Sequence, residues 1–183
     1  MRIDRRFLRV GSALPALACV AIATGCAGGV SRAGARPAAT TAVAEATHAF
    51  TRVTLERRPC SGTCPVYVVS IFGDGSGIFE SRAHADSVGR FTFHLAADRI
   101  AELARLVDSP RFTALGDRYV HGASACGLYA ADAPIVVVAV IRSAGSNTVE
   151  HDAGCTNAPR DLVALERELD ELIGTARWVG RGR

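Results

Sequence analysis

The N-terminus of the chain begins with basic residues, continues with an apolar stretch and ends in small residues. Three arginines lie within the first six residues, and the uncharged stretch 10–31 contains an apolar segment, 13–23. The apolar segment ends at Ala23-Thr24-Gly25-Cys26. This order is typical of an export signal that is removed from the mature protein. We therefore expect residues 1–25 to be a signal peptide and the rest of the chain to fold in an oxidising compartment.

Cys26 occupies the position of a lipidated cysteine. Ala23-Thr24-Gly25-Cys26 resembles the lipobox of bacterial lipoproteins, in which a diacylglycerol is attached to the cysteine before cleavage on its N-terminal side. The alternative is a retained transmembrane anchor, because the stretch approaches the ~20 residues that a spanning helix needs. Pro15 and the small residues before Cys26 favour the lipoprotein interpretation. The resemblance implies a lipid anchor in the cell envelope, and Ala27 favours the outer membrane, facing the periplasm.

Residues 26–48 are expected to be the lipidated cysteine and a flexible tether. This segment is mostly Ala, Gly, Thr, Ser and Arg, and it contains no aromatic residue, so it has little to bury. Residues 49–180 are then long enough for one domain with a single core. The sequence predicts one folded domain behind the tether.

The charge of the mature chain argues against a nucleic-acid partner. All 21 basic residues are arginine, and four of them lie in the expected signal peptide with one acidic residue. Removal of residues 1–25 leaves 17 arginines and 17 acidic residues. A formally neutral chain lacks the excess positive charge that phosphate binding needs. The absence of lysine also excludes a P-loop lysine, a Schiff-base enzyme and a pyridoxal-phosphate site.

The pattern of apolar residues predicts an α+β domain. Short segments rich in β-branched and aromatic residues predict six strands, and two segments with apolar residues at helical spacing predict amphipathic helices. The expected strands are 50–57, 66–72, 77–82, 91–95, 134–141 and 148–151, and the expected helices are 98–107 and 159–173. Four strands, a helix, two strands and a helix favour a two-layer fold, with an antiparallel sheet and both helices on one face.

Four cysteines remain in the expected domain. In an oxidising compartment an even number of cysteines indicates disulfides first, and four cysteines allow three connectivities. Locality favours Cys60 with Cys64 across a glycine-containing bend, and Cys126 with Cys155 across the last two strands.

Two sharper interpretations of the cysteines stay open. A redox site usually has C-x-x-C at a helix start, whereas Cys60 and Cys64 are separated by three residues and followed by Pro65. A zinc site would combine Cys60 and Cys64 with Cys155 or His151, but only one tight ligand pair is present. The five histidines do not cluster, and we expect each to be solvated or structural. No catalytic residue, metal ligand or cofactor is assigned.

A longer motif around the cysteine bend resembles a known family. Cys60-x-Gly62-x-Cys64-Pro65-x-Tyr67 followed by Gly73-Asp74-Gly75 is similar to a bacterial domain of unknown function, the family numbered 6438. Later landmarks agree in order: Phe112, Leu115, Asp117, Tyr119, Asp132 to Pro134, and Trp178. The resemblance implies a small, often exported or lipid-anchored domain, and it brings no established activity or catalytic residue.

These observations favour a non-enzymatic, disulfide-stabilised domain of the cell envelope with a binding or structural role. Its partner or ligand is not identified by the sequence. The alternative is an envelope thiol-disulfide or metal-binding protein that uses Cys60 and Cys64.

Overall fold

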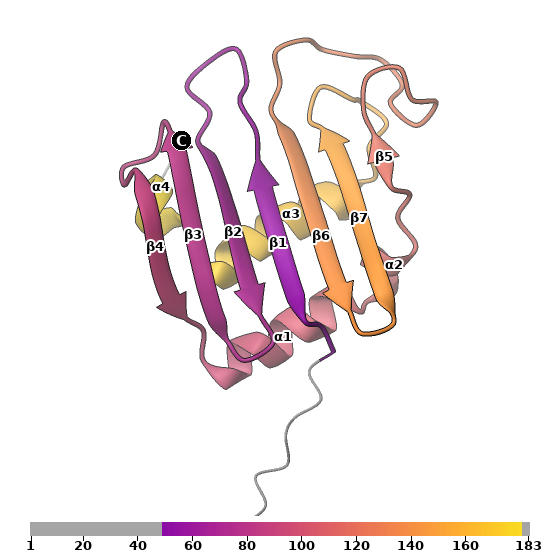
Figure 1. Ribbon diagram of the computed structural model, residues 1–183. Helices are drawn as coiled ribbons and strands as arrows, with labels where there is room; N and C mark the ends of the chain where they lie inside the picture. The colour runs from indigo at the N-terminus through magenta and orange to yellow at the C-terminus, as the bar shows by residue number, and fades with distance from the viewer. Residues whose placement is uncertain (1–48, 181–183) are drawn as a thin grey trace, which may run out of the picture. The chain divides into compact units, whose positions relative to one another are not determined.

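The computed structural model describes residues 49–180, so Cys26 and the expected tether lie outside the described residues. The described part contains a seven-stranded sheet with the strand order β4-β3-β2-β1-β6-β7-β5, together with four helices (Figure 1). The strands are β1 (Arg52–Arg57), β2 (Val66–Phe72), β3 (Ser76–Ala83), β4 (Gly89–His94), β5 (Arg118–Tyr119), β6 (Ile135–Arg142) and β7 (Gly145–Asp152). The helices are α1 (Ala97–Val107), α2 (Pro110–Thr113), α3 (Arg160–Ile173) and α4 (Ala176–Val179).

The α+β class is confirmed, but the expectation of a purely antiparallel sheet is wrong. Strand β5 pairs in parallel with β7, and the other neighbouring strands are antiparallel. β5 has only two residues, which is too short to show an alternating pattern in the sequence. Helices α2 and α4 have four residues each and were not expected, because a single turn shows no helical periodicity.

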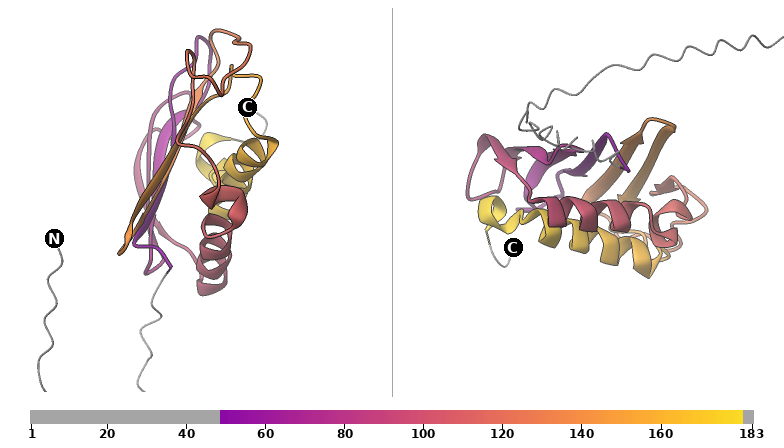
Figure 2. Two further views of the ribbon diagram at one scale, coloured as in Figure 1. Left: turned by 90° about the vertical axis from the view of Figure 1, so that its right-hand side faces the viewer. Right: turned by 90° about the horizontal axis from the view of Figure 1, so that it is seen from below.

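The core lies on the face of the sheet that the long helices cover. Alternate residues of the central strands are buried, as in β2, where Tyr67, Val69 and Ile71 are buried and their neighbours are half-buried. Figure 2 shows α1 and α3 along one face of the sheet. Helix α1 buries Ile100, Leu103 and Val107, and α3 buries Leu162, Leu165, Leu169, Leu172 and Ile173. Apolar burial between the helices and this face is therefore the main stabilising term.

Glycines with positive φ angles form the turns of the two hairpins β2–β3 and β6–β7. Gly75 has a positive φ of 88°, and its N–H donates to the carbonyl of Phe72, which closes the β2–β3 hairpin. The β6–β7 hairpin is tighter than expected, because Gly145 already pairs with Arg142 and has a φ of 144°. Strand β7 therefore begins at Gly145 rather than at Thr148.

Three loops gather at the end of the sheet where β1 ends, which is the opposite end from that where the described chain enters β1 (Figure 1). They connect β1 to β2, β5 to β6, and β7 to α3, and together they carry all four cysteines of the domain. Within residues 49–180, no helix combines the length and apolarity needed to cross a membrane.

Candidate functional site

Both disulfides lie in the loops at this end of the sheet. The structure pairs Cys60 with Cys64 and Cys126 with Cys155, at Cα separations of 5.8 and 4.6 Å, which is the connectivity that locality favours. The two bonds differ in their surroundings. Cys126 and Cys155 are buried, with 2% and 5% of their surface exposed, whereas Cys60 and Cys64 are half-buried. Only the first bond is therefore accessible from solvent to a useful extent.

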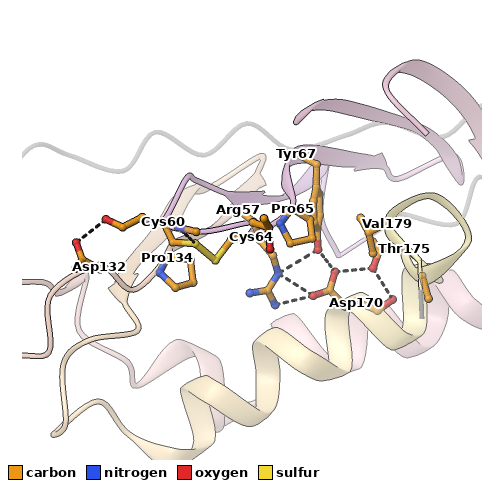
Figure 3. Close-up of a pocket in the computed structure, with 14 residues that line it drawn as sticks. Arg57, Cys60, Cys64, Pro65, Tyr67, Asp132, Pro134, Asp170, Thr175 and Val179 are labelled. Carbon is orange, nitrogen blue, oxygen red and sulfur yellow. Dashed lines mark hydrogen bonds and ion pairs between the residues drawn. A yellow bond between two sulfur atoms is a disulfide. The ribbon is translucent and has the colours of Figure 1, made fainter. Parts of the chain in front are cut away.

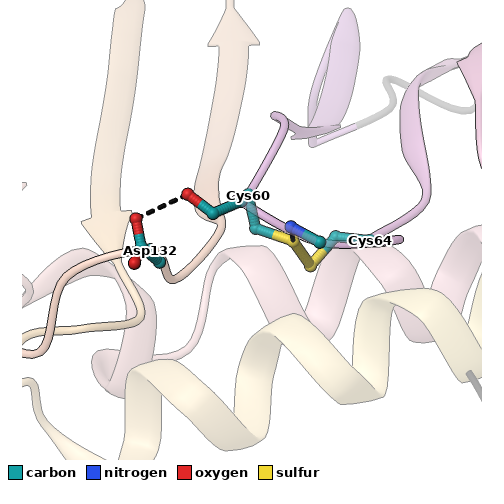
Figure 4. The surroundings of a disulfide bond; sticks show 5 residues. Cys60, Cys64 and Asp132 are labelled. Carbon is teal, nitrogen blue, oxygen red and sulfur yellow. Dashed lines mark hydrogen bonds between the residues drawn. A yellow bond between two sulfur atoms is a disulfide. The ribbon is translucent and has the colours of Figure 1, made fainter.

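The bend from Cys60 to Cys64 is tied to the β5–β6 loop (Figure 4). The backbone N–H of Ser61 donates to the carbonyl of Asp132 at 3.3 Å, and the Ser61 hydroxyl donates to the Asp132 carboxylate at 2.5 Å. Asp132 has a positive φ of 73°, a backbone conformation that is uncommon outside glycine. The two hydrogen bonds hold Asp132 in that conformation and connect the two loops.

Beside the bend, three side chains converge on the carboxylate of Asp170 (Figure 3). One oxygen of Asp170 accepts from Nε and Nη2 of Arg57, at 2.9 and 2.6 Å. The other oxygen accepts from the hydroxyls of Tyr67 and Thr175, at 2.5 and 2.7 Å. Arg57 also donates from Nε to the Tyr67 oxygen, at 3.0 Å. All four acceptor positions of the carboxylate are occupied, so Asp170 is not available as a general base while this network is intact.

The sheet register explains why these polar groups meet. Arg57 pairs with Tyr67 on one side and with Val136 on the other, and Val136 pairs with His151, so these residues form one row across four strands. Helix α3 carries the two acids that face this row, Glu166 and Asp170, one turn apart. Asp170 binds Arg57 and Tyr67, as described above. Nδ1 of His151 lies 2.7 Å from the Glu166 carboxylate.

Burial and neighbouring charge set the protonation states in this row. Burial raises the pKa of Tyr67 far above its usual value, and the negative charge of Asp170 raises it further. Burial is the largest single effect on the pKa of Arg57 and lowers it. The attraction to Asp170, together with the hydrogen bond to it and the influence of Tyr67 and Glu166, outweighs burial, so the pKa is raised overall. Tyr67 therefore stays neutral and Arg57 stays charged, and the network keeps its hydrogen bonds over the physiological pH range.

The network forms one wall of a pocket with a volume of about 1040 Å³. The Cys60–Cys64 bend and Pro65 form another wall, and Ala176 and Val179 of α4 add apolar surface. The pocket thus combines a disulfide, a fixed guanidinium and apolar groups. Such a combination of apolar lining and a few fixed polar groups suits the binding of a small ligand or a peptide side chain.

The residues expected to carry alternative chemistry are not brought together. Both sulfurs of Cys60 and Cys64 are in a disulfide, and His151 lies in the row described above. Among residues 49–180, no group of three or more His, Cys, Asp or Glu side chains is placed to hold a metal ion. The three exposed histidines lie apart: His84 is in the β3–β4 loop, His94 is in β4, and His121 is in the β5–β6 loop.

The polar row itself was missed by the sequence analysis. A signal for it exists, because Arg57 continues the inward alternation of Val53 and Leu55, and His151 continues that of Val149. Glu166 likewise stands on the apolar face of α3, between buried leucines. Polar residues at positions that the period assigns to the core are candidates for a buried network.

Comparison with known proteins adds a family but no activity. No curated protein matches the chain. The family described as a domain of unknown function, DUF6438, matches residues 51–173, which include the disulfide bend and both long helices. The chain therefore belongs to the DUF6438 family of domains of unknown function.

Proposed function

We propose that the chain is an exported lipoprotein, anchored to the cell envelope through Cys26, whose disulfide-stabilised domain binds a ligand or partner without catalysing a reaction. The observation that carries the binding role is the pocket beside the Cys60–Cys64 bend, whose charged groups are already satisfied by one another. A preformed pocket with a fixed hydrogen-bond network favours recognition, because little order has to be gained on binding.

The position of the pocket supports an anchored role. The pocket is lined in part by the β1–β2 loop. This loop lies at the end of the sheet opposite to the start of β1, where the chain enters the domain (Figure 1). The anchor and the pocket are therefore proposed to act through opposite ends of β1 in the chain's connectivity. The neutral formal charge of the mature chain also disfavours nucleic acid as that partner.

The binding role is tested by photocrosslinking in the producing cell. A benzophenone side chain is placed at Ala176, which is exposed and lines the pocket, and at Thr92, an exposed residue of β4, as the matched control. We expect a discrete adduct from position 176 that is absent from position 92. No adduct at either position, or the same adducts at both, would contradict binding at this pocket.

The anchor is tested independently by metabolic labelling. Labelled palmitate should enter the full chain and not the Cys26→Ser variant, because the thiol of Cys26 carries the lipid in this proposal. Equal labelling of the two proteins would exclude lipidation at Cys26. It would not affect the binding proposal, which the crosslinking experiment tests separately.

Thiol-disulfide exchange is the second candidate function, and the accessibility of the Cys60–Cys64 bond favours it. This bond lines the pocket and is half-buried, whereas the Cys126–Cys155 bond is buried. A redox titration of the full chain with peptide mapping separates the two functions. A binding domain should keep a Cys60–Cys64 potential below about −300 mV, whereas exchange catalysts lie between about −270 and −120 mV. A potential in the catalytic range, with turnover of a model disulfide, would replace binding by exchange.

A further inference from the structure

A second, smaller pocket lies on the other side of Arg57, between the end of β7 and α3. It has a volume of about 400 Å³, and its lining includes Arg57, Val136, His151, Val163 and Glu166. We infer that this pocket is a binding site in which Nε2 of His151 accepts a hydrogen bond from the O–H or N–H group of a small, neutral ligand with an apolar body.

The orientation of His151 is fixed by a buried contact. The side chains of His151 and Glu166 are 4% and 6% exposed, and Nδ1 lies 2.7 Å from the Glu166 carboxylate. A carboxylate accepts hydrogen bonds, so the hydrogen of a neutral imidazole ring lies on Nδ1. The lone pair is then on Nε2, which points away from Glu166 on the far side of the ring.

Nε2 of His151 can accept a hydrogen bond, but no described group donates one to it. No residue that the structure describes forms a hydrogen bond with it. Every fully buried side-chain nitrogen or oxygen in residues 49–180 does have a hydrogen-bond partner. An unpartnered Nε2 must therefore reach solvent although His151 as a whole is only 3% exposed. Since His151 lines the second pocket, this pocket is the route by which a ligand would meet Nε2.

The rest of the pocket defines the chemistry of the ligand. Val136, Ala158 and Val163 offer apolar surface, and Val163 is 51% exposed at the pocket. The lining also carries Glu166, Arg57 and Arg167. The two arginines are paired with Asp170 and Glu171, so no strong excess of either charge is left and a neutral ligand fits. Nη1 of Arg57 has no hydrogen-bond partner among the described residues, so it can donate to a ligand oxygen. A hydroxyl group on an apolar body can donate to Nε2 of His151 and accept from Nη1 of Arg57.

Phenol and anisole are a matched pair of probes for this site. They share the aromatic ring and the oxygen, but anisole has a methyl group in place of the donor hydrogen. Both are titrated into the full chain labelled with ¹⁵N at histidine, and binding is followed by NMR. Because one hydrogen bond separates the two ligands, phenol should bind about threefold to tenfold more tightly. The signal of His151 Nε2 should shift further with phenol, which donates to this nitrogen, than with anisole, which cannot.

Two variants localise the effect. His151→Phe keeps a ring but removes the acceptor, so the preference for phenol should disappear, whereas His121→Phe, on an exposed loop, should keep it. If His151→Phe does not fold, Val163→Trp decides, because a large side chain at this exposed position blocks the pocket without entering the core. Phenol should then no longer shift the Nε2 signal. Equal affinities for phenol and anisole, or an Nε2 signal that saturating phenol leaves unchanged in the wild type, would overturn the inference.

Discussion

Individual charged residues of this domain differ in how much they depend on their partners. The Arg57 and Asp170 side chains are 23% and 21% exposed, whereas those of the Arg90–Glu80 pair are 62% and 47% exposed. Exposed pairs contribute little, because water solvates both charges when the pair separates. Removal of one partner from a mostly buried pair instead leaves the other charge poorly solvated. Among these charged pairs, a single substitution at Arg57 or Asp170 should therefore lower the free energy of unfolding most.

We expect Asp170→Asn to destabilise the domain by about 2 to 4 kcal/mol, because the charge of Arg57 is left without a counterion near the core. Urea unfolding of the two proteins measures the difference. The control is Glu80→Gln, which removes the acid of the exposed pair with Arg90 and should leave the unfolding free energy nearly unchanged. Equal effects of the two substitutions would show that the Asp170 network does not stabilise the fold.

Tyr67 makes the stability of the domain fall as the pH rises into the alkaline range. Its pKa is raised by burial and by Asp170, whereas in the unfolded chain it has the usual value of about 10. The unfolded state therefore loses this proton first, and its contribution to stability is complete below about pH 10 and declines above it. The decline from this single group is at most about 1.4 kcal/mol per pH unit.

The measurement is urea unfolding between pH 9 and 11 on the wild type and on Tyr67→Phe, which has no proton to lose at this position. We expect the wild type to lose more stability over this range than the variant. Parallel pH curves for the two proteins would show that Tyr67 ionises as easily in the folded domain as in the unfolded chain.

At the scale of elements, the two disulfides constrain very different lengths of chain. The Cys60–Cys64 bond closes a bend within one loop, whereas the Cys126–Cys155 bond connects the β5–β6 loop to the loop after β7. The second bond therefore encloses the central hairpin β6–β7. It is also buried, so its loss affects packing as well as chain entropy.

The loop lengths predict an order of stabilisation. Closing five residues contributes roughly 2 kcal/mol and closing 30 residues roughly 3.6 kcal/mol in the loop-entropy model. We therefore expect Cys126→Ala with Cys155→Ala to lower the free energy of unfolding more than Cys60→Ala with Cys64→Ala. Each double substitution leaves no unpaired thiol, so the two are matched. Thermal and urea unfolding measure the difference, and the reverse order would contradict an entropic role for the longer loop.

At the scale of the whole molecule, charge limits the partners. Residues 26–183 carry equal numbers of arginines and acids, and many of the described charges are already paired with each other on the surface. We expect residues 49–183 to show no appreciable affinity for duplex DNA at physiological salt, because phosphate binding requires an excess of unpaired positive charge. Fluorescence anisotropy with labelled DNA tests this, and a salt-sensitive micromolar affinity would contradict it.

Much of the fold could be predicted from local pattern. The periods of β2, β6 and α3 identify these elements closely, because each is long enough to show which of its faces is buried. β5 and the single-turn helices could not be predicted, since two to four residues carry no period. The direction of β5 depends on where the chain returns to the sheet after α2, which is a property of the tertiary structure.

The candidate site shows the same division. The sequence by itself determined the four cysteines and the equal numbers of arginines and acids in residues 26–183, and it favoured the local cysteine pairing that the structure has, because each of these depends on residue type and separation along the chain. Only the tertiary structure decided that Arg57, Tyr67 and Asp170 meet, since Asp170 is 113 residues from Arg57 and comes from a helix that crosses the strands. The accessibility of Nε2 of His151 was likewise decided only by the tertiary structure. A contact of this kind depends on strand register and helix placement together, and neither can be read from one segment of the chain.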